Sequence, residues 1–179
     1  MDTKITISES TLSRFLFSNT KMALLWLVLR VYVGWLWLEA GWEKFNNPVW
    51  IGDQAGVGIS GFFNGSLAKV TGAHPDVSGW YAYFIEHFAM QHAVLFSYLI
   101  TYGEIAVGLG LIVGLFTGLA AFFGAVMNFN FMFAGTVSIN PLMLLIGIFI
   151  ISAYRVAGFI GLDYFVLPLF RKYFKSNIH

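Results

Sequence analysis

Four long stretches of apolar residues constrain the fold of this chain more than any other feature. They cover about residues 24–42, 93–116, 118–136 and 141–161. A helix needs about 20 apolar residues to cross the hydrocarbon core of a bilayer. Apolar residues make up 58% of the chain and charged residues 11%, a balance foreign to soluble domains. The sequence therefore predicts an all-α membrane protein, a bundle of four transmembrane helices in a single domain over 1–179.

The connections between the expected spans carry turn signals. Gly114 and Gly118 flank a short reversal between the second and third spans, and Thr117 is placed to cap the third helix. Gly135 is a stop signal for the third helix, and Pro141 suits the first turn of the fourth. The second and third spans are thus expected to form an antiparallel hairpin.

Basic residues concentrate in the two tails, which sets the expected orientation. The tails carry Lys4, Arg14, Lys21, Arg171, Lys172 and Lys175. Between the first and second spans, two lysines are offset by four acidic residues. Because basic residues favour the cytoplasmic side, the pattern predicts a multi-pass protein of the cell membrane with both termini in the cytoplasm.

The connection over about 43–91 is expected to be a long outer loop. It is rich in aromatic residues, and Gly79 to Met90 is predicted to form a short helix at the membrane interface, where Trp and Tyr are favoured. Two interpretations are open. The loop is either a lid over a cleft or an interfacial belt.

Polar residues inside the expected spans are few. Each span contributes one of Arg30, Glu104, Asn128 and Arg155 to the inner and middle membrane, while Glu39 lies near the outer end of the first span and Asn130 is a second amide in the third. Depth is counted from the cytoplasmic end of each span at a rise of about 1.5 Å per residue. Both arginines then lie about 9 Å deep, Asn128 about 15 Å and Glu104 about 18 Å. Such groups usually face the bundle interior. The four side chains are therefore expected to form one cluster.

This expected cluster has more positive than negative charge. Two arginines face one glutamate, and a surplus buried charge is unfavourable unless something compensates it. The compensating group is Asp163, water, a lipid headgroup, or an anionic or carbonyl-bearing ligand. The alternative is a structural Arg–Glu pair with the second arginine reaching the interface.

One face of the first span mixes small, aromatic and cationic residues. Arg30, Gly34, Trp37, Gly41 and Lys44 recur at three- and four-residue spacing. Such a stripe is typical of a bundle interior or of the wall of a cleft.

Several kinds of chemistry are excluded by residue content. The chain has no cysteine, which excludes disulfides, iron–sulfur clusters and thiol redox chemistry. None of its four histidines lies deep in a span, so a haem held by the chain is not expected, and no metal site is assigned. A net charge of +1 gives no reason to expect nucleic acid. Electron chemistry would need a bound organic cofactor or a partner subunit.

Two motifs resemble a known family. The first is Arg30-Val-Tyr-Val-Gly-Trp-Leu-Trp-Leu-Glu-Ala-Gly-Trp-Glu-Lys44, and the second is Gly103-Glu104 followed by Gly108-Leu-Gly110. They are similar to those of the DoxX/DoxD family of small four-helix membrane proteins, and the aromatic first span resembles the DoxD branch. The resemblance implies a link to quinone reduction, with thiosulfate as the donor in some members, and a second subunit of the DoxA kind.

The leading hypothesis is a subunit of a quinone-reducing oxidoreductase of the thiosulfate:quinone type. Glu104 is assigned the proton transfer that accompanies quinone reduction. The quinone-binding residues are predicted to be Arg30, Trp37, Lys44, Asn128 and Arg155, and Phe129 is expected to pack on the ring beside Trp37. Two rivals remain: a transporter for a small anion, and a membrane scaffold that recruits a soluble redox partner. Besides the lipid bilayer, a second copy of the chain is a candidate partner.

Overall fold

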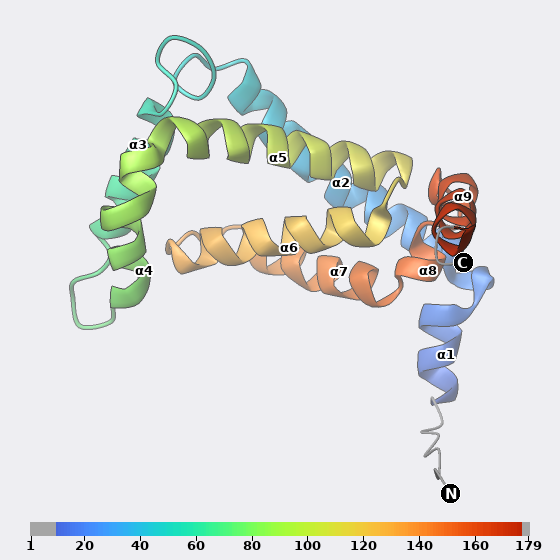
Figure 1. Cartoon of the computed structure of the whole chain (residues 1–179). Helices are drawn as coiled ribbons and strands as arrows, with labels where there is room; N and C mark the ends of the chain where they lie inside the picture. The colour runs from blue at the N-terminus through green and yellow to red at the C-terminus, as the bar shows by residue number, and fades with distance from the viewer. Residues whose placement is uncertain (1–9, 177–179) are drawn as a thin grey trace, which may run out of the picture.

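The protein is a bundle of helices, seen here in a computed structural model (Figure 1). The structure describes residues 10–176, except for the side chains at 171, 172 and 174–176. Within this part, every regular element is helical. Of the basic residues used to predict the orientation, Lys4 and the side chains of Arg171, Lys172 and Lys175 lie outside the described part.

Four helices make up the body of the bundle. They are α2 (Ala23–Phe45), α5 (Ala93–Val113), α6 (Thr117–Phe133) and α7 (Asn140–Ser152). Each lies within one of the four expected apolar stretches or extends beyond it by one to three residues at one or both ends. Together with the turns leading into them, α2 and α5 are long and apolar enough to cross a membrane, whereas α6 and α7 are shorter apolar helices.

The fourth helix is shorter than the expected span of 141–161. Helix α7 ends at Ser152, the chain turns at Ala153, and α8 (Tyr154–Ala157) continues in a new direction against α2 and α6. At 13 residues, α7 is about 20 Å long, less than the hydrocarbon thickness of about 30 Å. No glycine or proline marks the break, so the apolar run reads as one helix in the sequence.

The helices pack in antiparallel pairs. Helix α2 packs along α5 in the most extensive contact of the bundle, and α6 packs along α7. Gly108 permits the close approach of the first pair, because a Cβ at this position would lie 2.6 Å from the backbone nitrogen of Leu38. Figure 1 shows α5 and α6 joined at one end and separated at the other.

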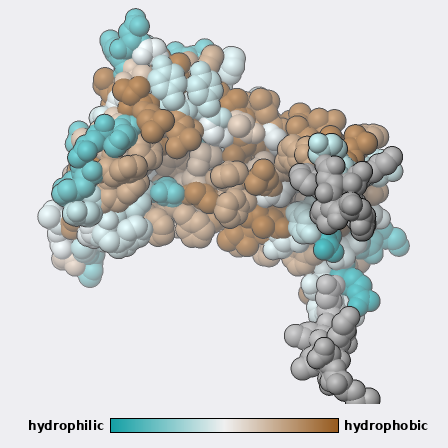
Figure 2. Space-filling model, viewed as in Figure 1, coloured by the Kyte–Doolittle hydropathy of each residue, from teal (hydrophilic) through white to brown (hydrophobic). Residues whose placement is uncertain are grey.

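The bundle has two distinct ends. At the terminal end, α2 and α6 begin, α5 and α7 end, and α1 (Thr11–Ser18) and α9 (Asp163–Ser176) lie nearby (Figure 1). At the loop end lies the connection between α2 and α5. Figure 2 shows hydrophilic side chains gathered at the loop end and near α1, with apolar side chains dominating the surface between them.

The expected outer loop is folded. It contains α3 (Val57–Leu67) and α4 (Gly79–Phe84), and α4 continues through a π-helical turn (Ile85–Ala89) and a 3-10 turn (Met90–His92) into α5. The helix expected over Gly79 to Met90 is therefore present. The segment has a hydrophobic core of its own, which includes Ile59, Phe63, Val77, Tyr81 and Ile85.

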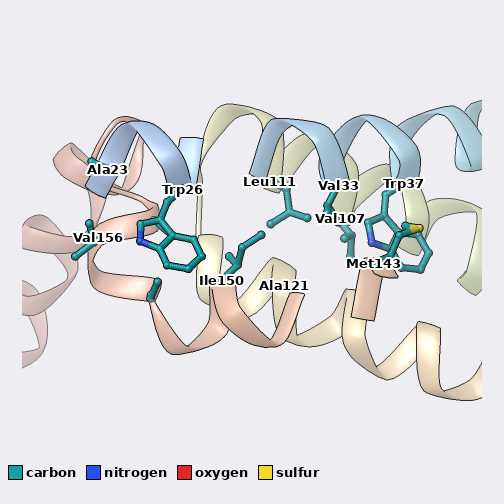
Figure 3. Close-up of a cluster of buried hydrophobic side chains, with 12 residues drawn as sticks. Ala23, Trp26, Val33, Trp37, Val107, Leu111, Ala121, Met143, Ile150 and Val156 are labelled. Atoms are coloured by element: carbon teal, nitrogen blue, oxygen red, sulfur yellow. The ribbon is translucent and has the colours of Figure 1, made fainter. Parts of the chain in front are cut away.

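A second apolar core lies between the four long helices. Trp26 and Trp37 of α2 contribute its largest side chains, together with Leu111 of α5 and Ile150 of α7. Figure 3 shows Trp37 beside Met143 toward one end of this core and Trp26 toward the other. The stripe predicted on the first span does face the interior, because Arg30, Gly34, Trp37 and Gly41 are buried.

Candidate functional site

The centre of the candidate site is an ion pair between α2 and α5. Lys44 Nζ donates to Glu104 Oε2 at 2.8 Å and to Oε1 at 3.1 Å, and it also approaches the carbonyl oxygen of Ala40 at 3.3 Å. The Glu104 side chain is 2% exposed and that of Lys44 is 20% exposed. Gly41 brings the helices together, since a Cβ there would lie 3.0 Å from Glu104 Cβ. The missing side chain lets Glu104 reach Lys44 one turn further along α2.

A cavity of about 290 Å³ adjoins this ion pair at the loop end of the bundle, and we call it the polar cavity. Its lining residues are Leu36, Trp37, Ala40, Lys44, Trp50, Ile59, Phe62, Glu104, Phe131, Thr136, Ser138, Ile139, Asn140 and Met143. The Lys44 ammonium lies over the Trp50 ring, 5.3 Å from its centroid. The cavity thus combines a single buried ion pair with aromatic and aliphatic walls, the composition typical of a small-molecule site.

Of the two further predicted residues, Trp37 lines the polar cavity and Asn128 does not. Trp37 is part of its wall and packs against Phe131 with ring centroids 6.3 Å apart. Asn128 is buried on α6, and its side-chain oxygen has no hydrogen-bond partner among the described residues. It lies one turn beyond Gly124, where a Cβ would be 3.1 Å from Trp37 Nε1. This spacing places Asn128 about 6 Å further toward the loop end than Gly124.

Arg30 is not part of this group, so the single cluster predicted from the sequence is not formed. Its Nη2 donates to the carbonyl oxygen of Ile160 at 2.8 Å, and its guanidinium lies against Gly114 and Gly161 at the terminal end. Glu104 is ten residues from Gly114 along α5, or about 15 Å. The antiparallel register of α2 and α5 explains the separation, because it places Gly34 against Leu111 and Gly41 against Glu104.

Arg155 also lies away from the polar cavity. It is an exposed residue of α8, and its Nε donates to the hydroxyl oxygen of Tyr154 at 2.9 Å. The break at Ala153 accounts for this position, since it turns the chain away from the axis of α7. The residue borders a polar hollow at the terminal end together with Ser13 and Ser152.

Asp163, and not Thr117 as predicted, caps the start of α6. Its carboxylate accepts hydrogen bonds from the backbone nitrogens of Phe116, at 2.6 Å, and Thr117, at 2.9 Å. It therefore caps α6 from 46 residues away. Thr117 was expected to cap this helix, but that prediction is wrong. Phe116 adopts a left-handed conformation and precedes the helix, and the buried Thr117 hydroxyl has no hydrogen-bond partner among the described residues.

Because Asp163 caps α6, its replacement should lower the stability of the protein. Asp163→Ala is expected to lower the free energy of unfolding by about 1–3 kcal/mol, because it leaves two backbone nitrogens at a buried helix start without an acceptor. Thr117→Val should change stability by less than about 1 kcal/mol, because it replaces a hydroxyl that makes no bond by a methyl group. Thermal unfolding in detergent measures both variants. A larger loss in Thr117→Val than in Asp163→Ala would contradict the assignment.

Each end of the bundle holds buried groups of both charges. Lys44 forms an ion pair with Glu104 at the loop end, and Arg30 and Asp163 both lie at the terminal end, where each bonds to the backbone. The surplus positive charge on which the anion-transporter hypothesis depends is therefore not concentrated in one cluster.

The polar cavity offers a definite chemistry. An ammonium can donate to a carbonyl oxygen, and a carboxylate beside it can carry a proton. Sequence reasoning identified both residues but did not pair them. It chose Phe129 to pack on the ring, but Phe129 is exposed, and Phe131 on the same helix lines the cavity instead. It did not single out Trp50, which lies in the loop.

Comparison with known proteins identifies the family of this chain. The sequence model of the DoxX family matches residues 25–137, which include α2, the folded loop, α5 and α6. Neither a curated protein nor a solved structure matches the chain. The match covers more than half of the chain and contains both members of the ion pair. This chain therefore belongs to the DoxX family and is an integral membrane protein.

Proposed function

We propose that the protein is a quinone-binding subunit of a membrane oxidoreductase. The observation that carries the proposal is the Lys44–Glu104 pair on the wall of a cavity that is otherwise mostly apolar and aromatic. A quinone head is a flat ring with carbonyl oxygens and no charge. The Lys44 ammonium would donate to one carbonyl oxygen, and Trp37 and Phe131 would pack against the ring.

Reduction of the bound quinone needs an electron pair and a pair of protons. Glu104 is the acidic group that lines the polar cavity, and it would pass the protons to the quinone oxygens one at a time, taking up each proton from water at the loop end before transferring it. The chain has no cysteine, so we assign the electrons to a donor outside it. Following the family resemblance, we propose thiosulfate, which yields electrons on oxidative coupling to tetrathionate, and a second subunit of the DoxA kind that binds it.

The proposal includes an orientation in the membrane. With four spans and both termini in the cytoplasm, as the basic tails predict, the polar cavity lies toward the outer side. A donor oxidised outside the cell membrane would then reach the loop end directly. Helices α3 and α4 cover this end, so the folded loop would shape the approach to the cavity.

Quinone bound to the purified protein tests the proposal. Protein from native membranes should carry quinone in nearly equimolar amount, and Lys44→Gln should lower the quinone content by about tenfold through loss of the ammonium donor. Lys21→Gln, which alters an exposed lysine at the start of α2, is the matched control and should retain it. Mass spectrometry measures the content. Quinone at the level of the co-purified lipid background in all three proteins would refute the proposal.

A further inference from the structure

Three hollows in the structure share lining residues, so they lie next to one another in a series. The polar cavity shares Phe62 and Phe131 with a cavity of about 160 Å³, which we call the aromatic cavity. The aromatic cavity shares Leu99, Val126 and Met127 with a groove of about 680 Å³, which we call the apolar groove. The series therefore leads from the ion pair to the apolar surface of α5 and α6.

The aromatic cavity separates the other two. Phe62 and Phe131 stand edge to face with ring centroids 6.0 Å apart, and both rings line the polar and the aromatic cavity. Tyr81 closes the far side, where its hydroxyl donates to the backbone oxygen of Asn130 at 3.0 Å. Rotation of one phenyl ring about its side-chain bonds would join the two cavities without movement of a helix.

The apolar groove exists because small residues line the facing surfaces of α5 and α6. Gly103, Ala106 and Gly110 contribute from α5, and Ala120 from α6. The groove extends along α5 from Leu99 to Val113, which corresponds to about 21 Å. Both helices are apolar and carry large exposed hydrophobic side chains here, so the groove opens toward lipid.

We propose that the aromatic cavity and the apolar groove hold the isoprenoid tail of a quinone whose head lies in the polar cavity. This inference rests on the proposed function and names the class of quinone, one with a long tail. A long apolar route that begins at a polar site and ends in lipid fits a molecule with a small polar head and a long hydrocarbon tail.

Charge favours a quinone over a phospholipid as the occupant. Lys44 and Glu104 are the charged residues that line the polar cavity, and they neutralise each other. A phosphate headgroup would place a negative charge beside the Glu104 carboxylate with no second cation in the lining to compensate it. A quinone head is neutral and needs only a donor for its carbonyl oxygen.

The tail is expected to determine the path of the quinone more than its affinity. Moving a tail from lipid into the groove removes no apolar surface from water, so it gains little hydrophobic free energy. The decisive experiment therefore locates the tail. The probe is a quinone that carries a diazirine at the end of its isoprenoid tail, added to the protein in nanodiscs and activated by light.

Mass spectrometry of the crosslinked peptides gives the position of the tail. We expect crosslinks concentrated on the residues of the apolar groove between Leu99 and Phe123. A fatty acid with the same diazirine is the control for general exposure to lipid, and it should label the outer surfaces of all the long helices. A quinone pattern equal to the fatty-acid pattern would overturn the proposed path.

Paired variants test the route without relying on the probe. Leu99→Trp with Val126→Trp narrows the junction between the aromatic cavity and the groove from both helices. Leu95→Trp with Phe122→Trp places the same side chain one turn away on each helix, at exposed positions that line neither the cavities nor the groove. The first pair should lower binding of a long-tailed quinone by about tenfold and spare a quinone with a single isoprene unit. The second pair should leave both unchanged.

The outcomes separate this inference from the proposed function. If the unaltered protein binds neither quinone, the proposed function fails and the inference with it. If the unaltered protein binds both quinones, the tail path fails when the Leu99→Trp with Val126→Trp pair weakens binding of both quinones equally or of neither. The proposed function stands in that case. Phospholipid that co-purifies with the protein, and that blocks crosslinking of the groove by the quinone probe even when quinone is in excess, would assign the route to a lipid and overturn the inference.

Discussion

Replacing Glu104 by glutamine is expected to lower the rate of quinone reduction by about 10²–10⁴-fold, the usual contribution of a positioned acid or base. Glutamine has the same shape and can still accept a hydrogen bond from Lys44, but it cannot carry a proton. Glu104→Gln should therefore lower the rate of quinone reduction strongly while the protein still folds. The measurement is donor-dependent reduction of quinone in membranes, alongside thermal unfolding of the purified variant.

A matched control is available on the neighbouring helix. Glu39 is an exposed glutamate of α2 that lines none of the cavities, and Glu39→Gln removes the same charge from the same region. It should reduce quinone at the normal rate. Normal turnover in Glu104→Gln, or an equal loss in both variants, would remove Glu104 from the mechanism.

Exchanging the two charges separates chemistry from packing. The double variant Lys44→Glu with Glu104→Lys keeps an ion pair between α2 and α5 but moves the carboxylate to the more exposed partner. If the pair only joins the helices, the exchange should restore turnover relative to either single variant. If Glu104 transfers protons from its own position, the exchanged protein should fold and remain inactive.

The positions of the helices follow from local signals in the sequence. The hairpin turns at Gly114, α6 ends shortly before Gly135, and α7 begins beside Pro141, as expected from the residues that end and start helices. The buried stripe on α2 follows from helical periodicity. Such features depend on residues a few positions apart, so one sequence is enough to predict them.

The pairing of side chains depends on features that the sequence does not display. Depth alone made Arg30 a plausible partner for Glu104, but the register of α2 against α5 gives the carboxylate to Lys44. The helix cap from Asp163 comes from a segment that α8 redirects toward the α5–α6 turn. The polar cavity takes Trp50 and Phe62 from a loop whose folded path cannot be read from its composition.

Gly114→Ala is expected to destabilise the protein by at least about 3 kcal/mol, which is comparable to breaking a buried charged contact. Gly114 ends α5 with φ at +68°, a left-handed conformation that costs other residues about 1–2 kcal/mol. A Cβ here would also collide with Nη1 of Arg30 and lie 2.6 Å from its Cζ. The guanidinium is buried among α5 and the segment before α9, so it has little room to move.

Gly52→Ala is the control for the backbone alone. Gly52 has φ at +109°, and a Cβ there would meet nothing within 4 Å. It should therefore show only the cost of the backbone conformation. The measurement for both variants is the fraction of monodisperse protein that survives heating in detergent. A loss at Gly114 that exceeds the loss at Gly52 is expected, because only Gly114 adds the collision with Arg30.

Removing the arginine should relieve most of the effect at Gly114. With Arg30→Ala the colliding guanidinium is gone, so adding Gly114→Ala should cost only the strain of the left-handed backbone, about 1–2 kcal/mol. The two single losses would then add up to more than the loss in the double variant, the behaviour of residues in direct contact. Strict additivity would mean that Arg30 does not occupy the space beside Gly114. That result would contradict the position of Arg30 at the terminal end, away from the polar cavity.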